Sequence, residues 1–229
     1  MCTRFSRVSD GKVLAQRFLI EGPVLEMRPD YNISPTDPVY VVVEDNGKRV
    51  LRRMFFGLIP SWSKDPKIGV KCLNARSETV DKLPAFRDAF RKRRCLIPTD
   101  GFFEFARNGT KRIPHRIVMK NREPFAMAGL WDRWRRPDGK DIESCAIVTT
   151  EPNILIQKIH NRMPVALRRE DEGLWLSPHV TEPKTLLPLL KPYSAEEMDY
   201  YQVSAAVNSS REKSEECIKP AAEEESLFS

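Results

Sequence analysis

The chain has 229 residues, of which 41% are hydrophobic and 31% charged, so it is long enough to bury a substantial core in one large domain or two small ones. It has no apolar run near the roughly 20 residues that cross a bilayer and no secretory leader, so we expect a soluble intracellular protein. Its five cysteines are scattered, odd in number and never in a C-x-x-C pair. That spacing argues against a disulfide framework and against a zinc site.

Charge is distributed unevenly. Residues 209–229 hold three Lys/Arg and six Asp/Glu and therefore have a net charge of −3. Because the whole chain has a net charge of +6, residues 1–208 have a net charge of +9. A basic body indicates a polyanionic partner, most commonly nucleic acid, although the same charge can serve solubility alone.

Short strands dominate the chain in sequence order. We predict strands at 39–43, 50–56, 68–73, 94–97, 114–119, 124–130 and 144–149, with turns at 45–48 and 137–139. Helices are expected at 79–90, 152–159 and 182–190, where prolines lie in a first turn or break the helix. Together these elements predict one mixed α+β domain over residues 1–208. The polar, charged tail 209–229 is expected to be disordered.

The second residue, Cys2, carries the most distinctive chemistry. If Met1 is removed, the amine and the thiol of Cys2 lie two carbons apart on one residue. The amine can condense with an aldehyde to an imine, and the thiol can then close onto the imine carbon. The product is a thiazolidine ring, a stable covalent capture of an aldehyde that no internal cysteine can perform.

A polar cluster at 74–79 follows the predicted strand 68–73. Asn74 can hold a substrate oxygen, and the planar fork of Arg76 suits a phosphate. The competing interpretation is a helix start, with Ser77 or Thr79 as the N-cap.

Glu104 is a single carboxylate among the aromatics of 102–105. Apolar surroundings raise a carboxyl pKa, which suits proton transfer. The alternative is an ordinary strand with Glu104 directed to solvent.

One of only three histidines, His160, lies beside Arg162 at the end of a predicted helix. A histidine can exchange protons near neutral pH, and Arg162 can contact phosphate. The alternative is a protonated histidine that is stabilised by the helix dipole. Trp62 follows a proline turn and can stack on a base, although such an aromatic is more often part of a core.

Read in order, these segments resemble the SRAP family, the abasic-site processing proteins that crosslink to DNA. The resemblance runs from Cys2 to about Asn208, and its motifs are Met1-Cys2 with Arg4, 31–36 (YNISPT), 56–62 (FGLIPSW), 74–79 (NARSET), 94–98 (RCLIP), 101–104 (GFFE), 128–131 (AGLW) and 159–164 (IHNRMP).

The resemblance implies a compact α+β domain with a mostly antiparallel, open barrel-like sheet, flanking short helices and a basic groove. It implies that mature Cys2 attacks the ring-opened aldehyde of an abasic site in single-stranded DNA. Asn74 would hold the opened sugar, Glu104 would handle the amine proton, and His160 would shuttle protons. Self-removal of Met1, with Cys2 as nucleophile, and lyase-like imine chemistry are implied as well, with neither a metal nor a cofactor.

The DNA contacts implied by the family are Arg4, Trp62, Arg76, Ser77 and Arg162. The expected partner is single-stranded DNA that contains abasic sites. The protein is expected to bind it as a monomer and not to associate with a membrane. A bacterial member would be cytoplasmic and nucleoid-associated, and a eukaryotic one nuclear.

The sequence departs from the family pattern at four positions. Thr3 replaces the usual glycine after the cysteine, and Asn161 replaces a frequent aspartate. Phe105 and Ser63 stand where tryptophan is common. We expect weaker stacking on DNA but intact chemistry.

Two other functions remain open at this stage. A self-processing peptidase that also acts on other chains would need Cys2 and Glu104 but no basic groove. A non-covalent reader of single-stranded or modified DNA would need Arg76, Arg162 and Trp62 but not Cys2.

Overall fold

The computed structural model describes residues 2–23 and 26–221. Its strands are β1 (Phe5–Arg7), β2 (Asp30–Ile33), β3 (Pro38–Asp45), β4 (Lys48–Phe56), β5 (Asn74–Arg76), β6 (Arg94–Thr99), β7 (Gly101–Asn108), β8 (Lys111–Met119), β9 (Phe125–Arg135), β10 (Asp141–Thr150), β11 (Met163–Pro164), β12 (Ala166–Leu167) and β13 (Met198–Gln202). Its α-helices are α1 (Gly11–Phe18), α2 (Arg87–Lys92), α3 (Arg169–Leu176) and α4 (Pro183–Leu186).

Five strands close into a barrel in the order β10, β4, β3, β6, β9 and back to β10. Four of the five pairings are antiparallel, and the β4–β10 pairing is parallel. The predicted single domain with a mostly antiparallel barrel-like sheet and short flanking helices is therefore confirmed, although the barrel is closed where the family resemblance implied an open one.

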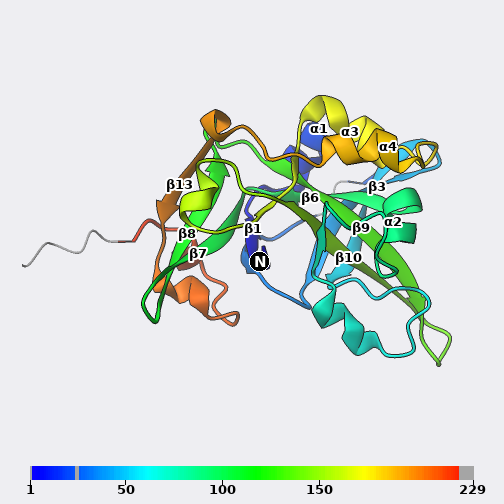
Figure 1. Cartoon of the computed structure of the whole chain (residues 1–229), viewed down its shortest axis with the longest axis horizontal. Coiled ribbons are helices and arrows are strands. Elements are labelled where there is room, and N and C mark those ends of the chain that lie inside the picture. The colour runs from blue at the N-terminus through cyan, green and yellow to red at the C-terminus, as the bar shows by residue number, and fades with distance from the viewer. Residues whose placement is uncertain (1, 24–25, 222–229) are drawn as a thin grey trace, which may run out of the picture.

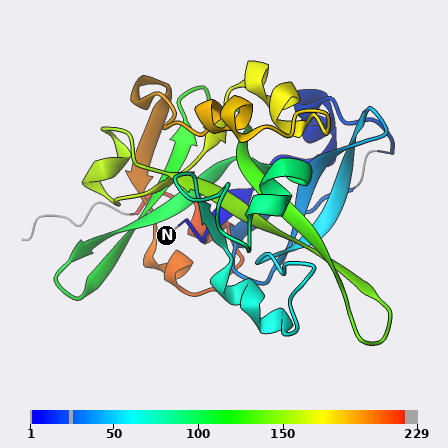
Figure 2. The same cartoon turned by 45° about the vertical axis from the view of Figure 1, so that its right-hand side comes forward.

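A second sheet, in the order β13, β8, β7, β1, β2, flanks the barrel (Figure 1). Apolar side chains from both sheets share one buried cluster, which includes Phe5 and Phe102 from the second sheet and Met54, Ile97 and Ile147 from the barrel. Because these side chains interdigitate, the first strand of the chain is fixed against the barrel. The turned view in Figure 2 shows the same arrangement, with long hairpins reaching out on either side.

Helices α1, α3 and α4 lie together on one side of the barrel (Figure 1). Their apolar faces bury Leu14, Phe18, Trp175 and Leu186 in a second core cluster. Arg94 anchors this layer, because its buried guanidinium donates to five backbone carbonyls, those of Phe90, Arg91, Trp175, Ser177 and Val180. Burial lowers the pKa of Arg94 to about 10.

Most predicted strands are present, with one exception. Residues 68–73 were expected to form a strand but lie largely in a 3₁₀ turn, Pro66–Lys71. Gly57 and Gly69 explain the difference, because a Cβ on either one would lie 2.8 Å from the backbone oxygen of the other. Two backbones that approach this closely fold the segment back under β4 and prevent an extended strand.

The helix predictions were less accurate. The expected helix 79–90 is mostly turns, and only α2 at its end is helical. The expected helix 152–159 is reduced to the 3₁₀ turn Ile156–Lys158, capped by the side chain of Asn153. The region 182–190 is helical as predicted and breaks into α4 and the 3₁₀ turn Leu187–Leu189. Helices α1 and α3 were not foreseen.

The expected disorder of the tail is wrong for residues 209–221. Cys217 is fully buried there, Lys213 forms an ion pair with Asp37 at 2.5 Å, and Pro220 bridges to Val203. We call residues 209–221 the C-terminal strap. Residues 222–229 lie outside the described part of the chain.

All five cysteines are free thiols with buried side chains. Across the described residues, 2–23 and 26–221, no helix is both long and apolar enough to span a membrane.

Candidate functional site

The candidate site lies where the start of β1 meets β7. Cys2 is 1% exposed, and the backbone N–H of Phe103 donates to the carbonyl of Arg4 at 2.9 Å, which extends the β1–β7 pairing toward Cys2. This pairing brings Cys2 close to Glu104, where burial and the charge of the carboxylate raise the pKa of the thiol. Cys2 therefore lies beside a buried acid.

Glu104 is 1% exposed in its side chain and does not face solvent, so the alternative of a surface strand residue is wrong. Its Oε2 atom lies 3.7 Å from Nδ1 of His160, and its buried Oε1 atom has no hydrogen-bond partner among the described residues. Burial raises the pKa of Glu104, and the neighbouring His160 and Cys2 oppose that shift. A buried carboxyl whose pKa is raised is a candidate group for proton transfer.

The pKa of the Cys2 thiol is raised well above its usual value. Burial is the main cause, the negative charge of Glu104 adds to it, and the positive charge of Arg162 works against it. The thiol is therefore held protonated and needs a base before it can attack.

His160 reaches the site from the loop after the 3₁₀ turn Ile156–Lys158. Its backbone N–H donates to the carbonyl of Ile156 at 2.9 Å, and its ring Nδ1 accepts the backbone N–H of Arg162 at 3.1 Å. These bonds fix the imidazole toward Glu104. No α-helix ends at His160, so the helix-dipole alternative is wrong.

Asn74 begins β5, which pairs in parallel with β10 at Ile147. Both polar atoms of its side-chain amide are buried and lack a hydrogen-bond partner in the described chain. A buried amide without partners is costly, so this side chain is suited to a ligand that supplies both a donor and an acceptor. The alternative of a helix start at 77–79 is wrong, because these residues form a turn and α2 begins only at Arg87.

Arg162 lies beside this strand. Its guanidinium donates to the carbonyl of Thr149 at 2.7 Å and pairs with both carboxylate oxygens of Glu78, at 2.5 and 3.0 Å. Its Nε atom is buried without a partner among the described residues. The backbone N–H of Ser77 also donates to Thr149, so Thr149 joins the loop of Arg162 to the cluster 74–79.

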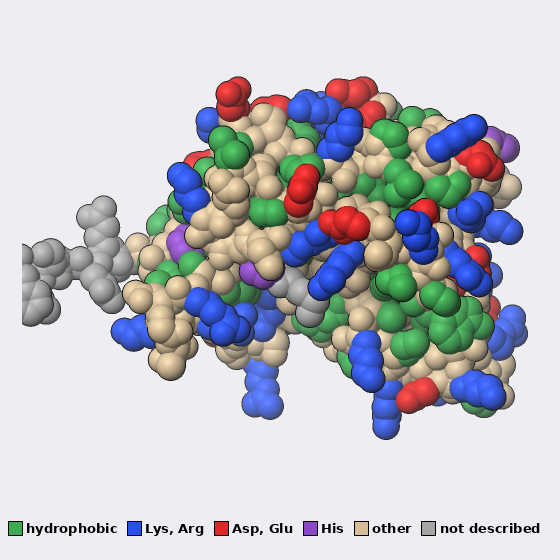
Figure 3. Space-filling model, in the orientation of Figure 1, with side chains coloured by type: hydrophobic (Ala, Val, Ile, Leu, Met, Phe, Trp, Pro, Cys, Tyr) green, Lys and Arg blue, Asp and Glu red, His purple; other side chains and the backbone are tan. Residues whose placement is uncertain are grey.

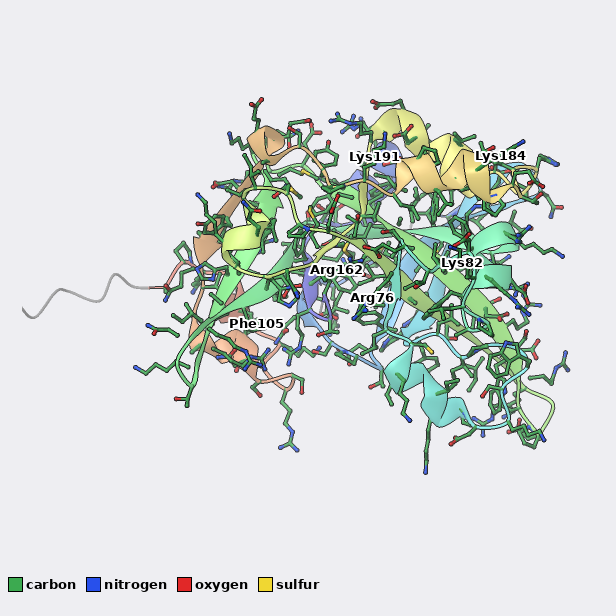
Figure 4. All side chains as sticks on the ribbon, in the orientation of Figure 1. Arg76, Lys82, Phe105, Arg162, Lys184 and Lys191 are labelled. Atoms are coloured by element: carbon green, nitrogen blue, oxygen red, sulfur yellow. The ribbon has the colours of Figure 1, made fainter. Side chains whose placement is uncertain are left out.

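Three basic residues, Arg162, Arg76 and Lys82, lie along one face of the molecule, and we call them the basic row. Figure 4 shows Arg162 and Arg76 near each other, with Lys82 beyond Arg76 and Phe105 on the opposite side. The space-filling view in Figure 3 shows blue side chains gathered at the centre of that face. Arg162 in this row lies close enough to Cys2 for its positive charge to lower the pKa of the thiol, against the larger effect of burial.

Trp62 is 56% exposed and donates from its ring N–H to the carbonyl of Pro84 at 3.3 Å. It is therefore a surface residue and not part of the core. Arg4 is largely engaged within the protein, donating to Asn32 and to the carbonyls of Val207 and Asn208. The roles predicted for Arg4, Ser77, Trp62, Arg76 and Arg162 in DNA binding stay predictions.

Sequence reasoning missed two contributors to this region. Glu78 pairs with Arg162, and the C-terminal strap accepts hydrogen bonds from Asn32. The adjacency of Glu78 to Arg76 in one polar cluster was the one available signal.

The structure is thus a single domain built on a small closed barrel, in which Cys2, near the start of the chain, is buried beside Glu104 and Glu104 lies close to His160. The chain belongs to the SOS response associated peptidase (SRAP) family, whose model matches residues 1–210.

Curated relatives agree with this membership. The chain is 42% identical over 222 residues to abasic site processing protein YoqW of Bacillus subtilis (strain 168), which covers 96% of this chain and 99% of that protein. It is 31% identical over 230 residues to abasic site processing protein HMCES of Xenopus tropicalis, across 86% of this chain and 68% of that protein. A crystal structure of a protein from Bacteroides thetaiotaomicron superposes with a TM-score of 0.88 at 27% identity and covers 96% of this chain and all of that one.

Proposed function

We propose that this protein recognises abasic sites in single-stranded DNA and captures their aldehyde covalently through mature Cys2. The names of the curated relatives support the abasic site as the target. The observation that carries the proposal is the burial of Cys2 beside the buried Glu104, because burial and the Glu104 carboxylate raise the pKa of the Cys2 thiol and the carboxylate can accept its proton.

The chemistry balances with one water released. The neutral amine of Cys2 attacks C1′ of the ring-opened sugar, and loss of water from the carbinolamine gives an imine. The thiol then adds across the C=N bond, its sulfur bonding to carbon while a proton reaches nitrogen. The resulting thiazolidine shields the lesion from strand cleavage.

Three side chains serve this sequence. Glu104, whose pKa is raised by burial, accepts the proton of the attacking thiol or amine. His160, oriented by the backbone of Arg162, exchanges protons with the sugar oxygen during ring opening and reversal. Asn74 supplies the unused amide donor and acceptor to the sugar hydroxyl groups.

The DNA strand would follow the basic row. Arg76 and Arg162 would contact the flanking phosphates, and exposed Trp62 would stack on a base. A single strand fits this arrangement best, because its sugar can open and turn into a buried site without breaking base pairs. We expect a monomer to suffice, in the bacterial cytoplasm or the eukaryotic nucleus.

Removal of Met1 must precede capture, because a peptide bond blocks the Cys2 amine. Cys2 can perform this step itself: its thiol attacks the Met1 carbonyl, the acyl group moves from nitrogen to sulfur, and water cleaves the thioester. The sequence provides the nucleophile, and Glu104 provides the base.

A denaturing gel tests the proposal. Mature protein is incubated with single-stranded DNA that carries one abasic site, with intact single-stranded DNA and with duplex DNA of the same sequence. We expect a shifted band that survives denaturation only with the abasic single strand and is absent in Cys2→Ala. A band that persists in Cys2→Ala rules out the proposed nucleophile, and a complex seen only on native gels indicates a non-covalent reader.

A further inference from the structure

Arg162 is the basic residue of the site whose guanidinium is already paired with a carboxylate. An arginine offers five N–H donors, and its two terminal nitrogens form the fork that receives a phosphate. Both of those nitrogens donate to Glu78, at 2.5 and 3.0 Å, in a bidentate pair. A phosphate that approaches this fork therefore meets a carboxylate in its place.

The two partners are held very differently. The Arg162 side chain is 17% exposed and is fixed by the carbonyl of Thr149 at 2.7 Å. The Glu78 side chain is 53% exposed and extends from a turn whose anchor is the buried Val80. Glu78 can rotate into solvent without disturbing the core, whereas Arg162 cannot leave. If another anion binds the guanidinium of Arg162, the carboxylate of Glu78 is therefore the group that moves away.

Granting the DNA binding proposed above, we propose that Glu78 is a specificity-determining residue that occupies the phosphate site of Arg162 and must be displaced by a DNA phosphodiester. The carboxylate mimics the charge and the bidentate geometry of the ligand. An isolated anion gains little by displacing it. A phosphate on a strand that also contacts Arg76 arrives at high effective concentration and can do so.

Displacement leaves the net charge beside the nucleophile unchanged, because one singly negative group replaces another. In the structure, burial and Glu104 raise the pKa of the Cys2 thiol and Arg162 lowers it, while Glu78 pairs with the same guanidinium. When the phosphate replaces Glu78, Arg162 stays where it is and its buried Nε–H remains available to the captured sugar. Arg162 would thus contact both the DNA phosphate, through its terminal nitrogens, and the captured sugar, through its Nε–H.

The test measures equilibrium binding to single-stranded DNA that contains a tetrahydrofuran abasic analogue. This analogue has no aldehyde, so binding is read by fluorescence anisotropy without crosslinking. We expect Glu78→Gln to bind about two- to fivefold more tightly than the wild type at ~0.1 M salt, since a surface ion pair of this kind is weak but present. Glu78→Ala, which also removes the carboxylate, should behave alike.

Glu123→Gln is the matched control. Glu123 is also 53% exposed and pairs with Arg169 at 2.6 Å, beside α3 and away from the basic row. The substitution Glu123→Gln removes the same charge as Glu78→Gln, so it reports the effect of net charge alone. We expect it to change the affinity for the DNA by less than about 1.5-fold. In an Arg162→Ala background, Glu78→Gln should lose its effect, because the shared partner is gone.

Equal affinities of Glu78→Gln and Glu123→Gln would overturn this role, as would weaker binding by Glu78→Gln, which would make Glu78 a support for Arg162. An absence of DNA binding by all of the proteins would overturn it too. The proposed covalent function is judged separately: if wild-type protein fails to crosslink aldehyde-bearing DNA while Glu78→Gln still binds the analogue more tightly, the capture chemistry is wrong and the role of Glu78 stands.

Discussion

The carboxylate of Glu104 lies 3.7 Å from the imidazole of His160, although β7 carries one and the loop before β11 carries the other. The two meet because β1 and β7 pair in the flanking sheet while β10 and β11 pair at the barrel. The candidate site thus lies where the two sheets meet, with Glu104 on a strand of one sheet and His160 in a loop beside a strand of the other.

Replacing Glu104 with glutamine should slow adduct formation by about 10²–10⁴-fold, the usual contribution of a general acid–base group. The amide keeps the size of the side chain but cannot accept the thiol proton. Single-turnover gels of covalent complex against time give the rate. Glu143→Gln serves as control, because Glu143 pairs with Arg52 and Arg133 outside the site. If Glu104→Gln matches this control, Glu104 has no part in proton transfer.

The same substitution should stabilise the fold in a pH-dependent way. Burial raises the pKa of Glu104 in the folded state, so its ionisation favours unfolding as pH rises above the unfolded value of about 4.3. Glu104→Gln should therefore melt at higher temperature than the wild type at pH 7. Each 1 kcal/mol gained corresponds to about 2–4 °C in a chain of this size.

Below about pH 4 both states of Glu104 are protonated, and the difference in melting temperature should vanish. Melting curves at pH 4 and 7 decide the matter. A difference that is the same at both values would show that burial of the charge is not its cause.

The C-terminal strap should support the N-terminal strand. Asn32 donates to the carbonyls of Ser209 and Glu212 at 2.9 Å each, Lys213 pairs with Asp37, and Cys217 is fully buried. A chain that ends at residue 208 loses these contacts, and we expect it to lose about 2–4 kcal/mol of stability.

Urea unfolding measures this loss, and a chain that ends at residue 221 is the control because it keeps every one of these contacts. Adduct formation should also slow in the shorter chain, since Arg4 donates to the end of the domain next to the strap. Equal stability of the two truncated chains would contradict a supporting role.

Binding to single-stranded DNA should weaken as salt increases, because each neutralised phosphate releases counterions. Arg76→Gln should reduce the slope of log K against log salt by roughly 0.7, the value for one contact on a single strand. Arg76 is exposed on the basic row, whereas the control Arg169→Gln alters an exposed arginine on α3. Identical slopes for the two variants would remove Arg76 from the DNA path.

The sequence was most informative where short-range pattern and structure coincide. Alternating and β-branched residues located β3, β4, β6, β9 and β10, which build the barrel, and β8 of the flanking sheet. Cys2, Glu104 and His160 were singled out by chemistry and by the family resemblance, and the structure brings them together.

What the sequence did not reveal depends on contacts between distant segments. The turn at 66–71 follows from the close approach of Gly57 and Gly69, which no local pattern encodes. The C-terminal strap is polar enough to predict disorder, yet its few apolar residues and its backbone carbonyls find partners on β2. The pairing of Glu78 with Arg162 joins residues that are 84 positions apart, so the sequence around Glu78 does not predict it.

The central claim is that both the amine and the thiol of Cys2 join the abasic sugar. Mass spectrometry of the crosslinked protein, after nuclease and protease digestion and treatment with iodoacetamide, tests it most directly. We predict that the sugar remnant lies on the peptide that begins with Cys2, with the mass of one water lost and with the thiol resistant to alkylation. A remnant on any other peptide, or one on Cys2 whose thiol is still alkylated, would contradict the thiazolidine.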